Sequence, residues 1–216
     1  MGFSNEQRGG GGKFINFRKG KLVNGGNEFL HFTGTLVDIG VDEGEYEGET
    51  YKRITLYMVD QDAKTQPLYH VQAAMNSGYM VAFMSMLPNI DHTKPFEISP
   101  GMRKSEDKKK EFATLFINQG GNHIKWYFKS SNEDKKKKFP EPKIVPVGNL
   151  KVKDYTDREN YFEKMIVDFL NKKLRKLFPD GHKSFKAAAG TAETTGTTSG
   201  KGNESAPPEM DDDLPF

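Results

Sequence analysis

The chain has 216 residues, with 32 lysines and arginines against 30 aspartates and glutamates, a size that suits one ordinary domain with appendages. It contains no cysteine, which excludes disulfides, thiolate metal sites and cysteine nucleophiles. No apolar run reaches membrane-spanning length, and the first residues lack the basic-then-apolar order of a signal peptide. We therefore expect no membrane partner, and a protein that stays in the compartment where it is made.

The first twelve residues predict a flexible arm, because they include Arg8 and four consecutive glycines at 9–12. We expect order to begin near Phe14. The next stretch mixes aromatic rings with cations, and it has two interpretations: it lies along a bound polyanion, or it is a first strand with solvent-facing lysines. The residues concerned are Lys13, Phe14, Phe17, Arg18, Lys19 and Lys21.

Between residues 28 and 129 the apolar residues recur mostly with period two, which predicts strands. The predicted strands are 29–39, 51–60, 67–74, 96–103, 111–118 and 123–129. A helix capped by Asn76 or Ser77 and ended by Pro88 interrupts them. Three strands, a helix and further strands is the order of a five-stranded OB-fold barrel, whose faces and loops bind single strands. We therefore predict a mainly β protein with an OB-fold nucleic-acid-binding domain over 13–130.

Strand parity places tyrosines and cations together on the side away from the core. In strand 51–60 the outward residues include Tyr51, Arg53 and Tyr57. In strand 123–129 the outward residues are Lys125, Tyr127 and Lys129. Cations for phosphates and flat rings for bases are what single-strand binding needs.

Strand 111–118 has two interpretations. Phe112 and Phe116 have the parity opposite to the expected core, so they are either stacking platforms or a second small core beneath a helix. Trp126 shares its parity with apolar neighbours and is assigned to the core. The acidic residues between the first two strands would repel phosphate, and we expect them to point away from the site; they are Asp42, Glu43, Glu45, Glu47 and Glu49.

The search for catalytic chemistry gives no candidate. The five histidines are scattered without metal spacing, and the Gly12–Lys13 pair lacks the Ser or Thr that a phosphate loop needs. We predict no enzyme activity and no cofactor.

The C-terminal third predicts three segments. Residues 131–156 form a basic, proline-containing linker. Residues 157–178 form an amphipathic helix, capped by Asp157, that packs on the core or on a second subunit, so a homo-oligomer is possible. Residues 187–216 are too poor in apolar groups to fold. This tail carries a charge of −5 and the rest of the chain about +7, which suggests a polyanionic partner for the body.

The last six residues combine three carboxylates with a terminal ring: Asp211, Asp212, Asp213, Leu214, Pro215 and Phe216. This ending resembles the acidic tip of bacterial and phage single-stranded-DNA-binding proteins, which usually have Ile where this chain has Leu214. The resemblance implies docking of the tip on partner proteins through Phe216 and the acidic run.

The resemblance further implies sequence-independent binding and protection of single-stranded DNA during replication, recombination and repair. It also implies recruitment of partner proteins by the tip, in the cytoplasm of a bacterium or a phage-infected cell. Two alternatives remain: an RNA-binding or RNA-chaperone OB protein, since stacking and phosphate contacts do not distinguish the sugars, and an adaptor that binds only proteins.

Overall fold

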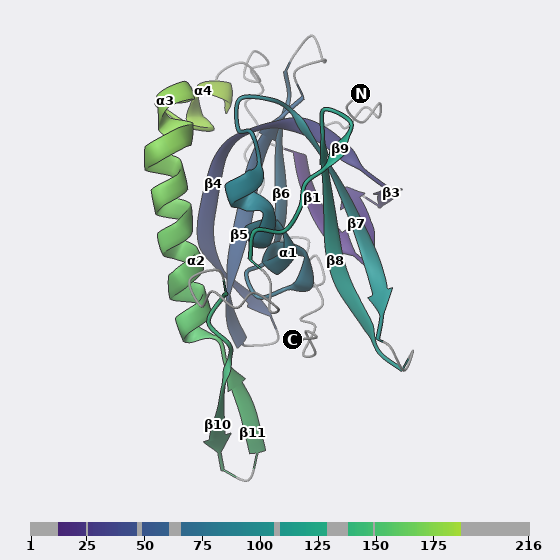
Figure 1. Ribbon diagram of the computed structural model, residues 1–216, viewed down its shortest axis with the longest axis vertical. Helices are drawn as coiled ribbons and strands as arrows, with labels where there is room; N and C mark the ends of the chain where they lie inside the picture. Colours follow the sequence, from purple (N-terminus) through teal and green to yellow (C-terminus); the bar gives the residue numbers. More distant parts are fainter. Residues whose placement is uncertain are drawn as a thin grey trace, which may run out of the picture.

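The computed structural model describes residues 13–24, 26–46, 49–60, 66–105, 109–128, 138–148 and 150–186 (Figure 1). Strands predominate, which confirms the mainly β prediction. One large sheet has the strand order β3-β2-β1-β6-β5-β4-β7-β8-β9. Its strands are β1 (Lys13–Arg18), β2 (Lys21–Asn24), β3 (Asn27–Phe29), β4 (Phe32–Tyr46), β5 (Glu49–Val59), β6 (Leu68–Ala74), β7 (Phe96–Lys104), β8 (Glu111–Gln119) and β9 (Asn122–His123).

This sheet is open, so the predicted closed five-stranded barrel is not observed. Within the described ranges β6 pairs with β5 and β1, and β8 pairs with β7 and β9, so β6 and β8 are not joined. The β1–β2 hairpin takes the place beside β6. Its turn packs near β7, where the Gly20 amide donates to the Tyr79 hydroxyl at 2.8 Å and the Met102 side chain lies close to Gly20. The N-terminal stretch is therefore a strand of the sheet.

The longest strand, β4, lies between β5 and β7 in the sheet. It pairs with β5 along most of its length and with β7 through Phe32, Thr33 and Gly34. A bulge between Leu36 and Asp38 interrupts its pairing with β5. Bulges increase local twist, which fits the bend of β4 across the molecule in Figure 1.

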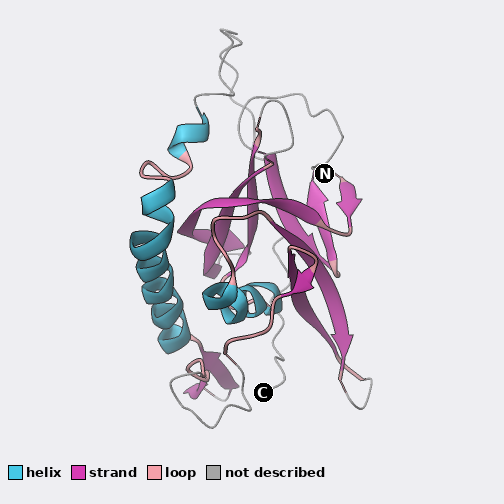
Figure 2. Ribbon diagram, turned by 45° about the horizontal axis from the view of Figure 1, so that its top comes forward, coloured by secondary structure: helices cyan, strands magenta, loops and turns pink. Residues whose placement is uncertain are grey.

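Helix α1 (Gly78–Met86) lies at the centre of the molecule (Figure 2). It begins at Ser77, whose hydroxyl accepts from the Met80 amide at 3.3 Å, and it leads into the short helix η1 (Leu87–Asn89), which contains Pro88. All its residues are buried. The apolar sides of the sheet pack against it, so one core joins α1 to the sheet.

A second helix lies along the β4 side of the sheet (Figure 1). It comprises α2 (Thr156–Phe169), the π-helical turn η3 (Leu170–Leu174) and α3 (Arg175–Leu177), and the short helix α4 (Lys183–Lys186) follows. The prediction of a helix over 157–178 located this element. Its start differs, because Asp154 rather than Asp157 accepts from the Thr156 amide, at 2.9 Å. No helix among the described residues is long and apolar enough to span a bilayer.

Two segments differ from the prediction. The expected strand 123–129 leaves the sheet after β9, because the Tyr127 amide donates to the Ser85 carbonyl of α1 at 2.7 Å. The expected linker 131–156 includes a separate hairpin, β10 (Lys143–Val147) and β11 (Leu150–Asp154). It also includes Phe139, which packs against Phe128 and Phe162 at centroid distances of 4.5 and 4.8 Å.

Candidate nucleic-acid interface

The side of β1, β6, β5 and β4 that faces away from the core carries polar and aromatic residues in cross-strand rows. We call it the polar face. Register defines three rows, since directly opposed residues share a side. They are Phe14, His70, Tyr57 and Asp38; then Asn16, Gln72, Thr55 and Gly40; then Ala74, Arg53 and Asp42.

The first row is a chain of touching rings. Phe14 and His70 meet edge to face with centroids 4.6 Å apart, and His70 meets Tyr57 in the same manner at 4.9 Å. Phe14 is 53% exposed at one end of the row, while His70 is buried within it. The row presents one accessible aromatic platform and fixes the orientation of the rings behind it.

The second row is polar. The Gln72 side-chain amide donates to the side-chain oxygen Oδ1 of Asn16 at 3.0 Å, and Thr55 is buried beside them. Gln72 and Thr55 are buried, so the partly exposed Asn16 is the member of this row that can contact the sugars and phosphates of a nucleic acid. The alternation of His70 and Gln72 with Val71 and Ala73 is a sequence signal for this row, and neither residue was among the predicted site residues.

Glycines on β4 fix the two tyrosines of β5. A Cβ at Gly44 would lie 2.6 Å from Cζ of Tyr51, and a Cβ at Gly40 would lie 3.0 Å from Cε2 of Tyr57. Each ring therefore lies across the neighbouring strand, which only a residue without a side chain permits. Burial, followed by the charges of Asp42 and Asp38, raises the pKa of Tyr57, so its phenol stays neutral.

The central cation of the polar face, Arg53, lies beside a carboxylate. The Arg53 Nε donates to Asp42 at 2.7 Å, and this hydrogen bond raises the pKa of Arg53. Asp42 is the cross-strand neighbour of Arg53 and therefore lies on the polar face. The prediction that Asp42 points away is wrong. Lys21 pairs with Glu28, and Arg18 is exposed at the end of β1.

The turn between α3 and α4 covers one end of the aromatic row. His182 stacks on Tyr57, and its Nδ1 lies 2.7 Å from Oδ2 of the buried Asp38. Arg175 donates to the other Asp38 oxygen at 2.6 Å. Burial acts to raise the pKa of Asp38, but the hydrogen bonds from His182 and Arg175 outweigh it and lower that pKa. We call residues 175–182 the clasp; no local sequence pattern predicts it.

Other predicted site residues lie elsewhere. Lys13 has the parity of the core side, and its Nζ lies 5.5 Å from the Tyr69 ring centroid. Phe112 and Phe116 lie on β8, which pairs with no strand of the polar face; Phe112 is 8% exposed and Phe116 43%. Phe112 is therefore buried and Phe116 accessible, and a stacking role for either stays a prediction.

The segment after β9 changes three assignments. Lys125 and Tyr127 do not share a strand face, because residues 124–128 are not in a strand; both are exposed near α1. Trp126 is partly buried and packs against the core, as expected. Lys129, the predicted flexible arm 1–12 and the predicted tail 187–216 with its last six residues lie outside the described residues.

Neither a metal site nor a similarity to known proteins identifies the function of this site independently. In the ranges that the structure describes, no three His, Asp or Glu side chains gather as a metal site. Comparisons with family models, with curated proteins and with solved structures found no match to this chain.

Proposed function

We propose that this protein binds single-stranded DNA without sequence preference through the polar face. The observation that carries the proposal is the aromatic row, which begins at the exposed Phe14 and lies beside a row of amide and hydroxyl groups. Stacking is tolerant of sequence because every base has a flat face, and each stacked base is typically worth about 1–3 kcal/mol.

In this proposal a single strand of DNA crosses β1, β6 and β5. Bases stack on Phe14 and Tyr51, and on Tyr57 when the clasp moves aside. Arg53 and Arg18 neutralise phosphates, and Arg53 then exchanges its bond to Asp42 for one to the nucleic acid. Backbone neutralisation is independent of sequence and weakens with salt.

The strand connections support an OB-type core as part of the proposal. β4, β5 and β6 are successive antiparallel neighbours, α1 follows, and β7 and β8 form a hairpin that rejoins β4. We propose that these five strands form an OB core held open by the β1–β2 hairpin. Such cores bind single strands on the outer face of their second and third strands, here β5 and β6.

The remaining part of the proposal concerns residues 211–216, which we assign to recruitment of replication, recombination and repair proteins. Deleting these six residues is expected to abolish that recruitment while DNA affinity stays the same or rises, because a competing anion is removed. Weaker DNA binding after the deletion contradicts this part alone.

The test of binding is fluorescence anisotropy with a labelled oligo-dT at two salt concentrations, with a duplex and a matched RNA as competitors. We expect tight, salt-sensitive binding that the duplex does not displace. Equal competition by RNA favours an RNA-binding role. Absence of binding, also after removal of 211–216, favours the protein adaptor.

A pair of variants ties binding to the polar face. Phe14→Ala is expected to lower affinity about fivefold or more, because a stacked base is lost. Leu30→Ala is the control, since Leu30 is 70% exposed on the loop between β3 and β4. Equal affinities for both variants would exclude Phe14 from the site.

A further inference from the structure

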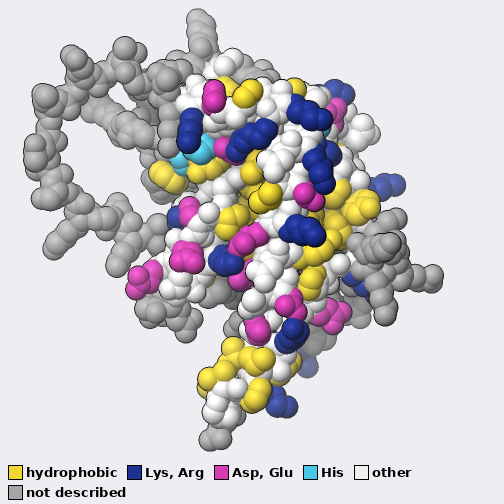
Figure 3. Space-filling view, turned by 90° about the vertical axis from the view of Figure 1, so that its left-hand side faces the viewer, with side chains coloured by type: hydrophobic (Ala, Val, Ile, Leu, Met, Phe, Trp, Pro, Cys, Tyr) yellow, Lys and Arg dark blue, Asp and Glu magenta, His cyan; other side chains and the backbone are white. Residues whose placement is uncertain are grey.

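The β10–β11 hairpin, which we call the arm, has four aliphatic residues at the outer end of one side, while Lys143 and Asp154 occupy the same side next to the body. Its register opposes Val145 to Val152 and Val147 to Leu150, so these four side chains share one face. Val147 is 57% and Leu150 69% exposed. Figure 3 shows apolar side chains gathered on the part of the molecule that projects below the body.

An arm of this kind needs a covering surface. A two-stranded hairpin alone is at best marginally stable in water, and an exposed aliphatic side with open strand edges favours association. In the described chain β10 pairs only with β11, and the arm extends away from the body (Figure 1).

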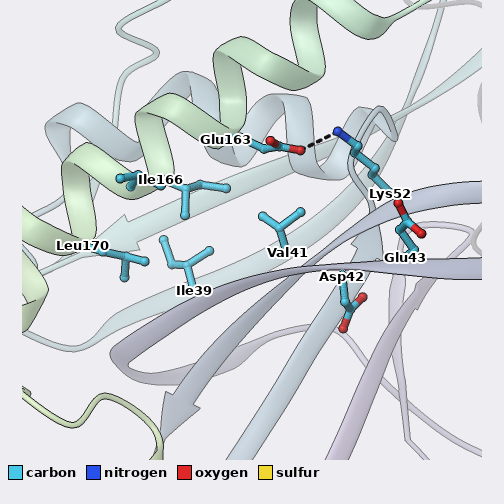
Figure 4. Close-up of a pocket in the computed structure, with 9 residues that line it drawn as sticks. Ile39, Val41, Asp42, Glu43, Lys52, Glu163, Ile166 and Leu170 are labelled. Carbon is cyan, nitrogen blue, oxygen red and sulfur yellow. Dashed lines mark hydrogen bonds and ion pairs between the residues drawn. The ribbon is translucent and has the colours of Figure 1, made fainter.

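A groove on the same side of the molecule has matching chemistry. It lies between β4 and α2, with a volume of about 450 Å³, and Figure 4 shows Ile39 and Val41 facing Ile166 and Leu170 across it. Val167 also lines it and is largely exposed. The groove is therefore lined by aliphatic side chains, of which Ile39 and Ile166 are buried and Val41 and Val167 are exposed.

The rim of the groove is acidic. Lys52 lies 2.5 Å from Glu163 and 3.9 Å from Glu159, and Glu43 is its cross-strand neighbour. Three carboxylates around one ammonium leave a negative excess. The arm carries Lys143, Lys151 and Lys153 against Asp154, so it is net positive and is attracted to the acidic rim.

The arm does not reach the groove of its own chain. β11 ends at Asp154, directly before α2, and the arm points away from the helix. The groove residue Ile166 lies ten residues into α2, about 15 Å along its axis. The groove is therefore not filled by the arm of its own chain.

We propose that the groove receives the arm of a second copy of this chain, and that two copies exchange arms reciprocally. The arm directly precedes α2, and the groove lies along α2. A two-fold axis that relates antiparallel α2 helices therefore places the arm of each copy beside the groove of the other copy. Such a contact is closed and self-complementary. The aliphatic residues of the arm cover the exposed Val41 and Val167, and the net positive charge of the arm lies beside the acidic rim at Glu43 and Glu163.

Sedimentation velocity of the full chain tests the proposal. The wild type is expected to be a dimer at tens of micromolar. Val147→Asp/Leu150→Asp in the arm and Val167→Asp in the groove are each expected to give monomers, with Leu30→Asp as the matched exposed control. Circular dichroism checks that every variant is folded. A monomeric wild type, or a dimer that survives both the arm and the groove variants, overturns the proposal.

Cross-linking tests which surfaces meet, and the absence of native cysteine makes it specific. A Leu150→Cys chain mixed with a differently tagged Val167→Cys chain is expected to form a mixed disulfide under mild oxidation. The pair Leu150→Cys and Leu30→Cys is the control. Equal yields from both pairs overturn the placement of the arm in the groove, as does the absence of any mixed product.

Discussion

The imidazole of His182 lies parallel to the phenol ring of Tyr57, with centroids 3.9 Å apart and planes inclined by 8°. Because Tyr57 lies over Gly40, His182 covers the side of the ring that a base would use. The bond to Asp38 fixes the imidazole in this position. Under the proposed function, His182 therefore competes with a base for the same platform.

The first prediction is that His182→Ala binds oligo-dT more tightly than the wild type. Removing the imidazole exposes Tyr57, so the DNA no longer has to displace a ring that is stacked on this tyrosine. We expect about a fivefold gain, since one stack is worth about 1 kcal/mol or more. Anisotropy titration at fixed salt measures it.

The double variant His182→Ala/Tyr57→Ala is the control for this gain. It is expected to bind no more tightly than the wild type, because the exposed platform is gone. An affinity that is the same in the single and double variants would show that Tyr57 takes no part in binding.

The second prediction concerns the pH dependence of stability. The pKa of Asp38 is lowered in the folded protein, so its contribution is present above the unfolded value of about 3.9 and is lost as pH falls through the lower folded value. Asp38→Asn is expected to cost about 2 kcal/mol at pH 7, from two charged hydrogen bonds. The cost is expected to shrink below about pH 4.

Urea unfolding of the wild type and of Asp38→Asn from pH 7 to pH 3 measures this cost. Lys172→Ala removes a charge from an exposed ion pair with Asp168 and serves as the control, with a small and nearly constant effect across the range. A cost for Asp38→Asn that is constant down to pH 3 would be inconsistent with a folded clasp held by the carboxylate.

The third prediction concerns Gly181, which has φ +58° and lies against Asp38. A Cβ there would be 2.2 Å from Oδ2 of Asp38. Gly120 has φ +57° with open space around it, so it offers the same backbone conformation without the clash. Gly120→Ala is expected to cost about 1 kcal/mol from the backbone alone.

Gly181→Ala is expected to cost clearly more than Gly120→Ala, because the added methyl group displaces Asp38 from the clasp. Thermal unfolding of both variants measures the difference. Under the proposed function Gly181→Ala also exposes Tyr57 and raises DNA affinity, as His182→Ala does. Equal destabilisation of the two variants would mean that the clasp adapts to the methyl group without loss.

The sequence was sufficient where local patterns decide the structure. Period-two alternation located β5, β6, β7 and β8, and the Ser77 cap with Pro88 located α1. Parity in strand 51–60 correctly placed Tyr51, Arg53 and Tyr57 on one side of the sheet. These features depend only on neighbours in the chain.

The sequence was insufficient where distant segments meet. Residues 124–128 continue an alternating pattern, yet a hydrogen bond from Tyr127 to α1 replaces the strand pairing. Closure of the barrel depends on whether β6 meets β8 or the N-terminal hairpin. The clasp joins Asp38 to His182 across more than a hundred residues, which no local pattern encodes.

The fourth prediction concerns the ion pair of Asp42 and Arg53, which are cross-strand neighbours on the polar face. Asp42→Asn is expected to strengthen oligo-dT binding, because Arg53 no longer leaves a carboxylate to meet a phosphate. Arg53→Ala is expected to weaken it and to reduce the slope of log K against log salt by about 0.7, the value for one phosphate contact on a single strand. Both variants should stay folded, since a half-exposed pair contributes about 0–1 kcal/mol.

Anisotropy titrations at four salt concentrations give the slope for each variant. Lys172→Ala is the control for loss of a charge, because it lies in η3 rather than on the polar face, and its slope should equal that of the wild type. If Arg53→Ala and Lys172→Ala changed the slope equally, binding would depend on overall charge and not on the polar face. A reduced slope for Arg53→Ala alone, with tighter binding by Asp42→Asn, would assign the phosphate contact to Arg53 and give Asp42 the role of its competitor.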